Sequence, residues 1–352
     1  MRAVSIPFTL PSALVLARDP AKAQKQHGLQ ARCNVVRPDS SQLTPKVYSS
    51  LKESIQKPSR RSTLLGGAMM LVGPWSVAAQ AVAESGVLDE VTIQVDTAPD
   101  QRAYDPTDER LRKAATMLQD ALDAPTVEKE EAGWTTIIEQ FQSVEADWVP
   151  DIVGRAYGNR GNARSRQGKF EPALADYNKA IELCPWSVDP VLNRGVLFEN
   201  TKRLDLAERD YRAVLKANPQ DPVGWNNLGN VQIGQGKFQE ALSSLDRALQ
   251  LSPEFAFAAA NHMIAQFETG NTNGAIKEAR TTLRRYPSFP EARAILVAAL
   301  WKEGLEVQAE TEWQRVDDPR YSDRRWLRSE RRWPDGVRGS LEAFLDLKSV
   351  KQ

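Results

Sequence analysis

Certain residue types recur at a fixed spacing through the middle of the chain, and this regular spacing restricts the folds that the chain can adopt. Its clearest marks are four evenly spaced prolines, Pro185, Pro219, Pro253 and Pro287, each 34 positions after the one before. Two more columns keep the same register, namely Ala173, Ala207, Ala241, Ala275 and Ala309, and Gly161, Gly195 and Gly229, with Met263 at the fourth glycine position. Several columns that stay in phase over this length indicate a tandem repeat.

The residue types in these columns predict that each unit is a pair of antiparallel helices. Small residues such as Gly161 and Ala173 let two helix backbones approach closely, and Tyr177 and its equivalents fill the gaps. The proline ends the second helix because it has no amide donor and biases the preceding residue away from helical angles. Since one helix pair cannot bury its own apolar face, the units must stack into an all-α solenoid.

The pattern resembles the tetratricopeptide repeat, whose 34-residue unit combines an aromatic residue, Leu-Gly, a later Ala and a closing Pro. The third copy keeps it most fully, as Trp225, Leu228, Gly229, Ala241 and Pro253. The resemblance implies a right-handed superhelix of about five repeats over residues 151–319, the last of them degenerate. It also implies that the first helix of each unit lines the concave face.

The regions beside the repeats predict helical caps at both ends. Residues 106–150 predict an N-terminal capping helix pair, and residues 320–352 predict basic C-terminal capping helices. Within the C-terminal region, the pattern favours one helix from Tyr321 to Trp333 and a second from Val337 to Lys348. The end units of a solenoid lack a neighbour on one side, so caps of this kind are expected.

The segment 1–83 differs in charge from the rest of the chain, with a net charge of +8 against −8 for the segment 84–352. It is rich in Ser, Ala, Arg and Lys. It contains Arg60-Arg61, an apolar run from Leu64 to Ala79 and a small-x-small site, either Ala79-Gln80-Ala81 or Ala81-Val82-Ala83. These parts, in this order, resemble a bipartite transit peptide over 1–83 with a twin-arginine signal for the thylakoid lumen. A membrane-anchored or stromal protein is the alternative. Residues 84–105 are acidic and predict a linker.

The sequence offers little material for catalysis or for a bound cofactor. After the segment 1–83 only one cysteine and one histidine remain, Cys184 and His262, so no disulfide framework and no Cys/His zinc site can form there. We expect Cys184 to be a buried small hydrophobe and His262 to be a packed residue. There is no Gly-rich phosphate loop. We therefore expect no enzyme activity, no cofactor, no metal and no small-molecule substrate, and the net charge of −8 disfavours nucleic acid.

A column of asparagines is the best candidate for a binding site. Asn159, Asn193, Asn227 and Asn261 recur with the period of the repeat, and in the first and third copies a second asparagine follows one turn later, Asn162 and Asn230. A carboxamide offers donors and an acceptor, so it can hold a peptide C=O and N–H whatever the side chain. First helices of neighbouring units lie roughly 10 Å apart, which suits an extended peptide that advances about 3.3 Å per residue. The column resembles the asparagine ladder of the protein O-glycosyltransferase solenoid. Alternatively, these amides tie down loops or face water.

The expected function is therefore a non-catalytic scaffold that binds an extended peptide or a protein partner in its groove. The tail with Trp326-Leu327 and Arg331-Arg332-Trp333-Pro334 resembles that of plant and algal thylakoid tetratricopeptide proteins. That resemblance implies a thylakoid-lumen protein in the assembly or maintenance of a photosynthetic membrane complex, with peripheral membrane association as an option. The alternatives are a chaperone-like adaptor in another compartment, a non-catalytic subunit of an enzyme, or a structural spacer.

Overall fold

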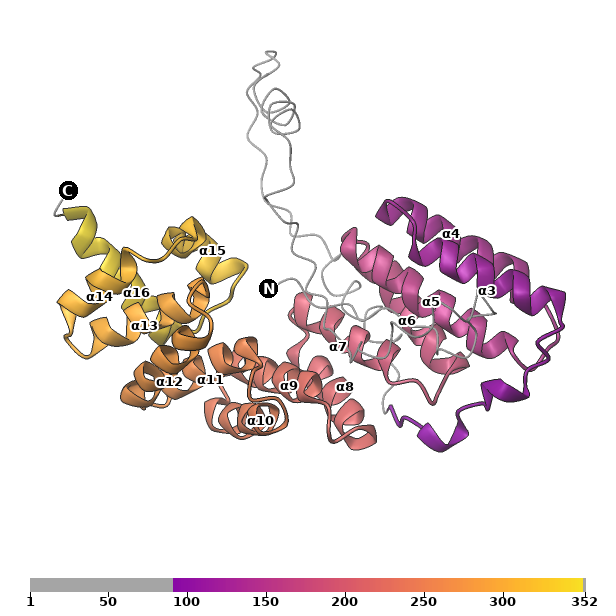
Figure 1. Cartoon of the computed structure of the whole chain (residues 1–352), viewed down its shortest axis with the longest axis horizontal. Helices are drawn as coiled ribbons and strands as arrows, with labels where there is room; N and C mark the ends of the chain where they lie inside the picture. The colour runs from indigo at the N-terminus through magenta and orange to yellow at the C-terminus, as the bar shows by residue number, and fades with distance from the viewer. Residues whose placement is uncertain (1–90, 351–352) are drawn as a thin grey trace, which may run out of the picture. The chain divides into compact units, whose positions relative to one another are not determined.

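A computed structural model describes residues 91–350, with side chains up to Leu347, and the described chain is helical throughout (Figure 1). The predicted presequence over 1–83 lies outside the described residues. Two helices precede the repeats, five pairs follow, and two helices come last: α3 (Glu109–Leu122), α4 (Val127–Phe141), α5 (Val149–Arg166), α6 (Phe170–Leu183), α7 (Asp189–Asn200), α8 (Leu204–Ala217), α9 (Pro222–Gly234), α10 (Phe238–Leu251), α11 (Ala256–Glu268), α12 (Thr272–Arg285), α13 (Pro290–Lys302), α14 (Glu306–Trp313), α15 (Arg324–Ser329) and α16 (Asp335–Val350). From α3 to α14 each helix packs on the next, which confirms the expected all-α solenoid of helix pairs.

The turn inside each repeat needs one residue with left-handed backbone angles. Four repeats use glycine there, with φ between 71° and 85°: Gly168, Gly236, Gly270 and Gly304. The second repeat has Lys202 at the same position, with φ of 63°. Glycine adopts this conformation freely because it has no Cβ, whereas a side chain costs roughly 1–2 kcal/mol.

The two helices of a repeat lie close together at the glycine column. A Cβ atom on Gly161 would lie 2.8 Å from the ring of Tyr177, and one on Gly195 would lie 2.8 Å from the ring of Tyr211. Both tyrosines are almost fully buried. The glycine column therefore makes room for a large residue 16 positions later, as the sequence predicts.

A second set of residues, also 16 apart, joins the helices of a repeat by charge. Arg194 of α7 donates two hydrogen bonds to Asp210 of α8, at 2.9 and 2.8 Å, and both side chains are at most 3% exposed. Arg160 and Asp176 pair in the same way in the first repeat, at 3.0 and 2.8 Å. A buried ion pair needs satisfied hydrogen bonds to offset desolvation, and both pairs have them.

The N-terminal helices α3 and α4 pack against the first repeat, where Trp134, Ile137 and Phe141 are buried. Residues 91–105, the described part of the predicted linker, hold two short 3-10 turns, Val95–Thr97 and Gln101–Ala103. They are attached to the first repeat: the amide of Gln94 donates to the carbonyl of Pro185 (2.8 Å), and Gln101 Nε2 donates to Asp151 (2.8 Å).

The C-terminal region differs from the expectation of one helix from Tyr321 to Trp333. Only α15 is α-helical there, and residues 330–334, which we call the C-terminal segment, are not. The prediction was wrong because buried contacts of Arg331 and Trp333 with α13 hold the segment out of helical geometry. The last helix, α16, packs on α13 and α11, and its Val337 amide donates to Glu268 at 2.7 Å.

Candidate functional site

The predicted binding asparagines, which we call the amide row (Asn159, Asn162, Asn193, Asn227, Asn230 and Asn261), lie on the first helices of four consecutive repeats, α5, α7, α9 and α11. Four of them are at most 3% exposed, namely Asn159, Asn162, Asn193 and Asn261. None of these four is without a polar partner. Only Asn227 and Asn230, both on α9, are half-buried. The part of the row that is open to a new partner is therefore centred on α9.

Three asparagines and one arginine form a hydrogen-bonded relay with a fixed direction. Arg331 of the C-terminal segment donates to Asn261 Oδ1 at 3.2 Å, and Asn261 Nδ2 donates to Asn226 Oδ1 at 3.0 Å. Asn226 Nδ2 in turn donates to Asn227 Oδ1 at 3.4 Å. A guanidinium can only donate, so it orients the Asn261 amide and, through it, the next two. The relay uses the oxygen of Asn227 and leaves its Nδ2 donors available for a new acceptor.

The second asparagine of α9 is oriented by a carboxylate. Asn230 Nδ2 donates to Glu199 Oε1 at 2.6 Å, and the other carboxylate oxygen accepts from the Tyr211 hydroxyl at 3.1 Å. Since a carboxylate accepts, Asn230 must turn its nitrogen toward Glu199 and keep its own oxygen on the opposite side. Burial raises the pKa of Glu199, while the hydrogen bond from Tyr211 opposes that shift. Asn162 plays a different part, because its oxygen accepts from the buried Tyr177 hydroxyl at 2.9 Å.

The C-terminal segment reaches back to the second repeat. Arg332 Nη1 donates to the carbonyl of Glu199 at 2.8 Å, and its Nη2 donates to the carbonyl of Asn200 at 3.1 Å. These carbonyls belong to the last turn of α7, and that of Glu199 also accepts from the Lys202 amide at 3.1 Å. Arg331 of the same segment binds Glu291 of α13 and Asn261 of α11. The segment therefore joins α7, α11 and α13.

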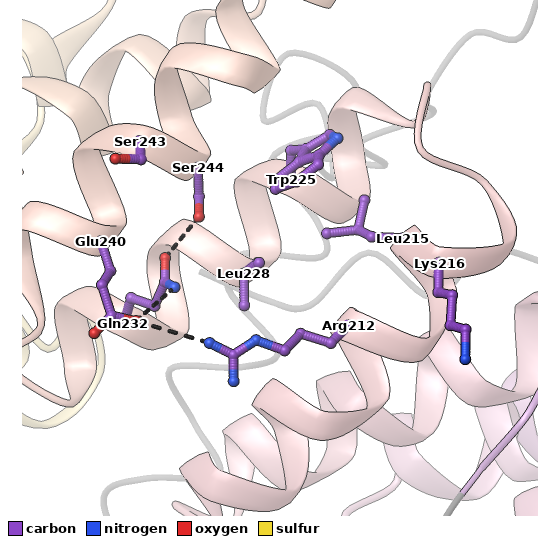
Figure 2. A pocket seen from close by; sticks show the side chains of 9 residues that line it. All are labelled: Arg212, Leu215, Lys216, Trp225, Leu228, Gln232, Glu240, Ser243 and Ser244. Atoms are coloured by element: carbon purple, nitrogen blue, oxygen red, sulfur yellow. Dashed lines mark hydrogen bonds and ion pairs between the residues drawn. The ribbon is translucent and has the colours of Figure 1, made fainter.

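A hollow of about 460 Å³ lies between α8 and α10 over α9, and Figure 2 shows its lining. It opens where the ion-pair column is interrupted, because the third repeat has Leu228 and Ser244 at the positions of Arg194 and Asp210. Ser244 donates instead to Gln232 at 2.7 Å. Arg212 lines the hollow from α8 and is paired with Glu208. The hollow thus lies where the third repeat lacks the ion pair of the second.

His262 and Cys184, which the sequence predicts to be packed or buried, both lie in structural surroundings. His262 Nδ1 lies 2.7 Å from Glu278, and its Nε2 lies 3.3 Å from Asp246, so it is a half-buried ion-pairing residue in the Arg194 column rather than a purely packed one. Burial raises the pKa of the Cys184 thiol to about 12, and the side chain is 1% exposed, as expected of a buried hydrophobe. Within residues 91–350, no cluster of His, Cys, Asp and Glu could hold a metal ion. Nor does any helix in that range have the length and apolarity to cross a bilayer.

Sequence reasoning missed four residues of this site: Asn226, Glu199, Arg331 and Arg332. Asn226 occurs in one repeat, and Glu199 occupies a position where the other repeats differ, so neither forms a column. The two arginines stand in the tail, within the stretch that was expected to be helical. The useful signal would have been the Trp-Pro pair at Trp333-Pro334, because the residue before a proline disfavours helical angles.

Family comparison identifies the repeats. Models described as Tetratricopeptide repeat match residues 154–187, 189–221 and 222–255. The described helix pairs have the same boundaries to within a few residues. These three segments are tetratricopeptide repeats.

Curated relatives are similar over short stretches. The chain is 33% identical over 99 residues to a peroxisomal targeting signal receptor of Candida glabrata, which is 28% of this chain and 17% of the relative. It is 29% identical over 163 residues to Protein FlbA of Caulobacter vibrioides, or 44% of this chain and 27% of the relative. With Heat shock protein STI1 of Saccharomyces cerevisiae it shares 32% identity over 102 residues, 28% of this chain and 17% of that protein. The chain thus spans less than a third of these relatives.

Solved structures agree on the fold. A tetratricopeptide repeat protein from Parabacteroides merdae superposes with a TM-score of 0.54 at 17% identity, over 68% of this chain and 87% of that one. The Cut9-Hcn1 hetero-tetramer structure of the APC/C gives a TM-score of 0.50 at 16% identity, over 66% and 42%. At this identity the likeness establishes the solenoid alone. Tetratricopeptide solenoids generally act as protein-interaction scaffolds.

Proposed function

We propose that this protein is a non-catalytic scaffold that holds an extended segment of another protein along its amide row. The observation that carries the proposal is the pair Asn227 and Asn230 on α9. The relay from Arg331 uses the oxygen of Asn227 and leaves its N–H donors for a partner, and Glu199 binds the nitrogen of Asn230 and leaves its oxygen. One side chain therefore offers donors and the other an acceptor.

This pair matches the backbone of an extended chain. Residues three apart on a helix lie about 5–6 Å from each other on the same face. In an extended strand, the N–H and the C=O of one residue point to the same side and bind a neighbour together. Asn227 can donate to such a C=O while Asn230 accepts from the N–H. Recognition of this kind contacts only the backbone C=O and N–H groups, so it does not depend on the partner's side chains.

The rest of the amide row supports the pair on α9 and does not extend the contact. Asn159, Asn162 and Asn193 continue the row toward the N-terminal repeats, but they are at most 3% exposed and already have partners. Asn261 is fully buried and held by Arg331, so it orients its neighbours instead of meeting the partner. We therefore place the partner over α9.

A matched pair of isosteric substitutions tests the amide contact. Asn227→Asp keeps the oxygen that accepts from Asn226 and removes both N–H donors. We expect partner binding to weaken by a factor of about 5 to 100, since an unpaired hydrogen-bond partner costs about 1–3 kcal/mol. Asn273→Asp, the same change at an exposed position of α12, is the control. Equal binding by the Asn227→Asp variant and the wild type would refute the backbone grip.

Site-specific cross-linking tests the location of the partner. A photo-cross-linking residue at position 230 should capture an extended segment of another protein, identified by mass spectrometry of the cross-linked peptide. The same residue at Gln250, exposed on α10, should capture none. Products from position 250 alone would move the binding surface to the second helices.

We further propose that the protein works in the thylakoid lumen, in the assembly or maintenance of a photosynthetic membrane complex. The support is the order of parts in residues 1–83: a basic Ser/Ala-rich stretch, Arg60-Arg61, an apolar run and an Ala-x-Ala site. Import of the full chain into isolated chloroplasts should give a shortened lumenal form, and Arg60→Lys with Arg61→Lys should block it. If both forms stay outside the lumen, the chain is better regarded as a chaperone-like adaptor or an enzyme's non-catalytic subunit elsewhere.

A further inference from the structure

The C-terminal end of α7 already holds a guanidinium. Arg332 spans two successive backbone carbonyls, Glu199 O at 2.8 Å and Asn200 O at 3.1 Å. The last turn of a helix carries partial negative charge on such carbonyls and attracts cations. A planar guanidinium presents two parallel donors, which fits two adjacent acceptors better than the single ammonium of lysine does. The site therefore has the chemistry of an arginine site.

Arg332 binds this site while its own backbone is in a strained conformation. Its φ is 56°, a left-handed conformation that side chains other than glycine rarely adopt. The side chain is exposed, unlike those of its neighbours in sequence. Arg331 is 7% exposed and bound to Glu291 and Asn261, and Trp333 is 2% exposed with its indole N–H toward Glu291 at 3.5 Å. Arg331 and Trp333 are anchors, whereas Arg332 can leave without opening the core.

The arginine site adjoins the pair Asn227 and Asn230 on α9, which is proposed to bind the partner's backbone. The carboxylate of Glu199 belongs to the same residue as one of the carbonyls that Arg332 binds, and it accepts from Asn230 at 2.6 Å. Its two oxygens accept from the hydroxyl of Tyr211 and the amide of Asn230, both of which are neutral donors. A segment lying over Asn227 and Asn230 would thus pass next to a set of acceptors at the end of α7.

We propose that the end of α7 is an arginine site for the bound segment, occupied by Arg332 until a partner's arginine replaces it. The inference rests on the proposed scaffold function and names its partner as an extended segment that carries an arginine. The chain's own residue is a competitor at high local concentration, since tethered groups reach effective concentrations in the millimolar range.

The test uses the full chain and a fluorescein-labelled synthetic peptide with the sequence of residues 328–335. Arg332→Gly removes the competing guanidinium and the strain together. We expect this variant to bind the peptide at least tenfold more tightly than the wild type in an anisotropy titration. Arg325→Ala, at an exposed arginine of α15, should bind like the wild type. Equal affinities for the Arg332→Gly variant and the wild type would overturn the proposal.

Altered peptides identify the group that is recognised. Alanine in place of the peptide's equivalent of Arg332 should remove the tenfold gain, and lysine should retain only part of it. Loss of binding on replacing the equivalent of Arg331 alone would point to the anchor site and would also overturn the proposal. The Asn227→Asp variant separates the two hypotheses. If it binds the peptide normally and the arginine is still required, the backbone grip fails and the arginine site stands.

A second variant guards against misfolding. If Arg332→Gly lowers helicity or the thermal midpoint, Arg332→Gln removes the competing guanidinium and keeps a polar side chain at that position. We then expect peptide affinity to rise several-fold over the wild type. Unchanged affinity would contradict a role for this end of α7.

Discussion

A Cβ atom placed on Gly229 would lie 2.6 Å from Cγ of Leu245, so no larger residue fits there while Leu245 keeps its position. The fourth repeat reverses the sizes, with Met263 at the glycine position and Ala279 at the leucine position, both fully buried. From the third repeat to the fourth, the small and the large residue of this contact therefore change places. The space available to the pair stays about the same.

This exchange predicts a rescue. Gly229→Met alone should destabilise the protein by about 1–3 kcal/mol through overpacking, and Leu245→Ala alone by about 2–5 kcal/mol through a cavity. The double variant reproduces the fourth repeat and should be more stable than either single variant. Urea denaturation of all four proteins measures the coupling. A double variant whose destabilisation equals the sum of the two would show that the contact is not reciprocal.

The left-handed turn residue of the second repeat can be improved. Lys202→Gly removes a Cβ from a residue at φ 63° and should stabilise the protein by about 0.5–1 kcal/mol, because the relief of strain exceeds glycine's entropic cost. Gly236→Lys is the reciprocal control. An added Cβ at Gly236 meets nothing within 4 Å, so any loss of stability there is conformational. Thermal unfolding of both variants should shift in opposite directions.

The hollow over α9 should close when the missing ion pair is restored. Leu228→Arg with Ser244→Asp recreates the Arg194–Asp210 arrangement, whose two bonds measure 2.9 and 2.8 Å. Each single variant buries an unpaired charge and should be clearly destabilised, whereas the pair should recover about 1–3 kcal/mol as coupling energy. A double-mutant cycle in urea measures this value. No coupling would mean that the third repeat differs from the second in more than these two residues.

His262 predicts a pH dependence of the fourth repeat. Burial lowers the pKa of its ring, but the hydrogen bond and charge of Glu278, together with Asp246, raise the pKa by more, so it ends above the ordinary value of 6.5. A histidine whose pKa is higher in the folded state stabilises the fold below the unfolded pKa. That contribution is lost as the pH rises through the folded value.

The thermal midpoint should therefore fall between pH 6 and pH 8.5 by more in the wild type than in a His262→Gln variant, which keeps a polar side chain but cannot titrate. Circular dichroism at several pH values measures the difference. Parallel curves for the two proteins would show that the ion pairs of His262 contribute nothing to stability.

The repeat architecture could be predicted because its determinants are local. Proline spacing, turn glycines and the Gly161–Tyr177 register each depend on residues within one unit. The path of residues 330–334 could not be predicted. The contact of Arg332 with Glu199 joins residues 133 apart, and it depends on how the intervening repeats stack.

The candidate site, too, could be predicted from the sequence only in part. The regular spacing of the asparagines predicted which helices carry the amide row, and the structure places the row on them. The hydrogen-bond partner of each amide could not be predicted. Asn261 binds Arg331, which is far along the chain, and Asn230 binds Glu199 of the preceding repeat. The row itself remains a prediction until binding is measured.

The relay that begins at Arg331 makes the surface of α9 asymmetric in its hydrogen-bonding groups. With donors at Asn227 and an acceptor at Asn230, a strand laid across them fits best with its N–H over Asn230 and its C=O over Asn227. A strand running the opposite way must shift its register to keep this match. On the proposed mode of binding, the chain's own arginine would thus set the register of a guest that it need never touch.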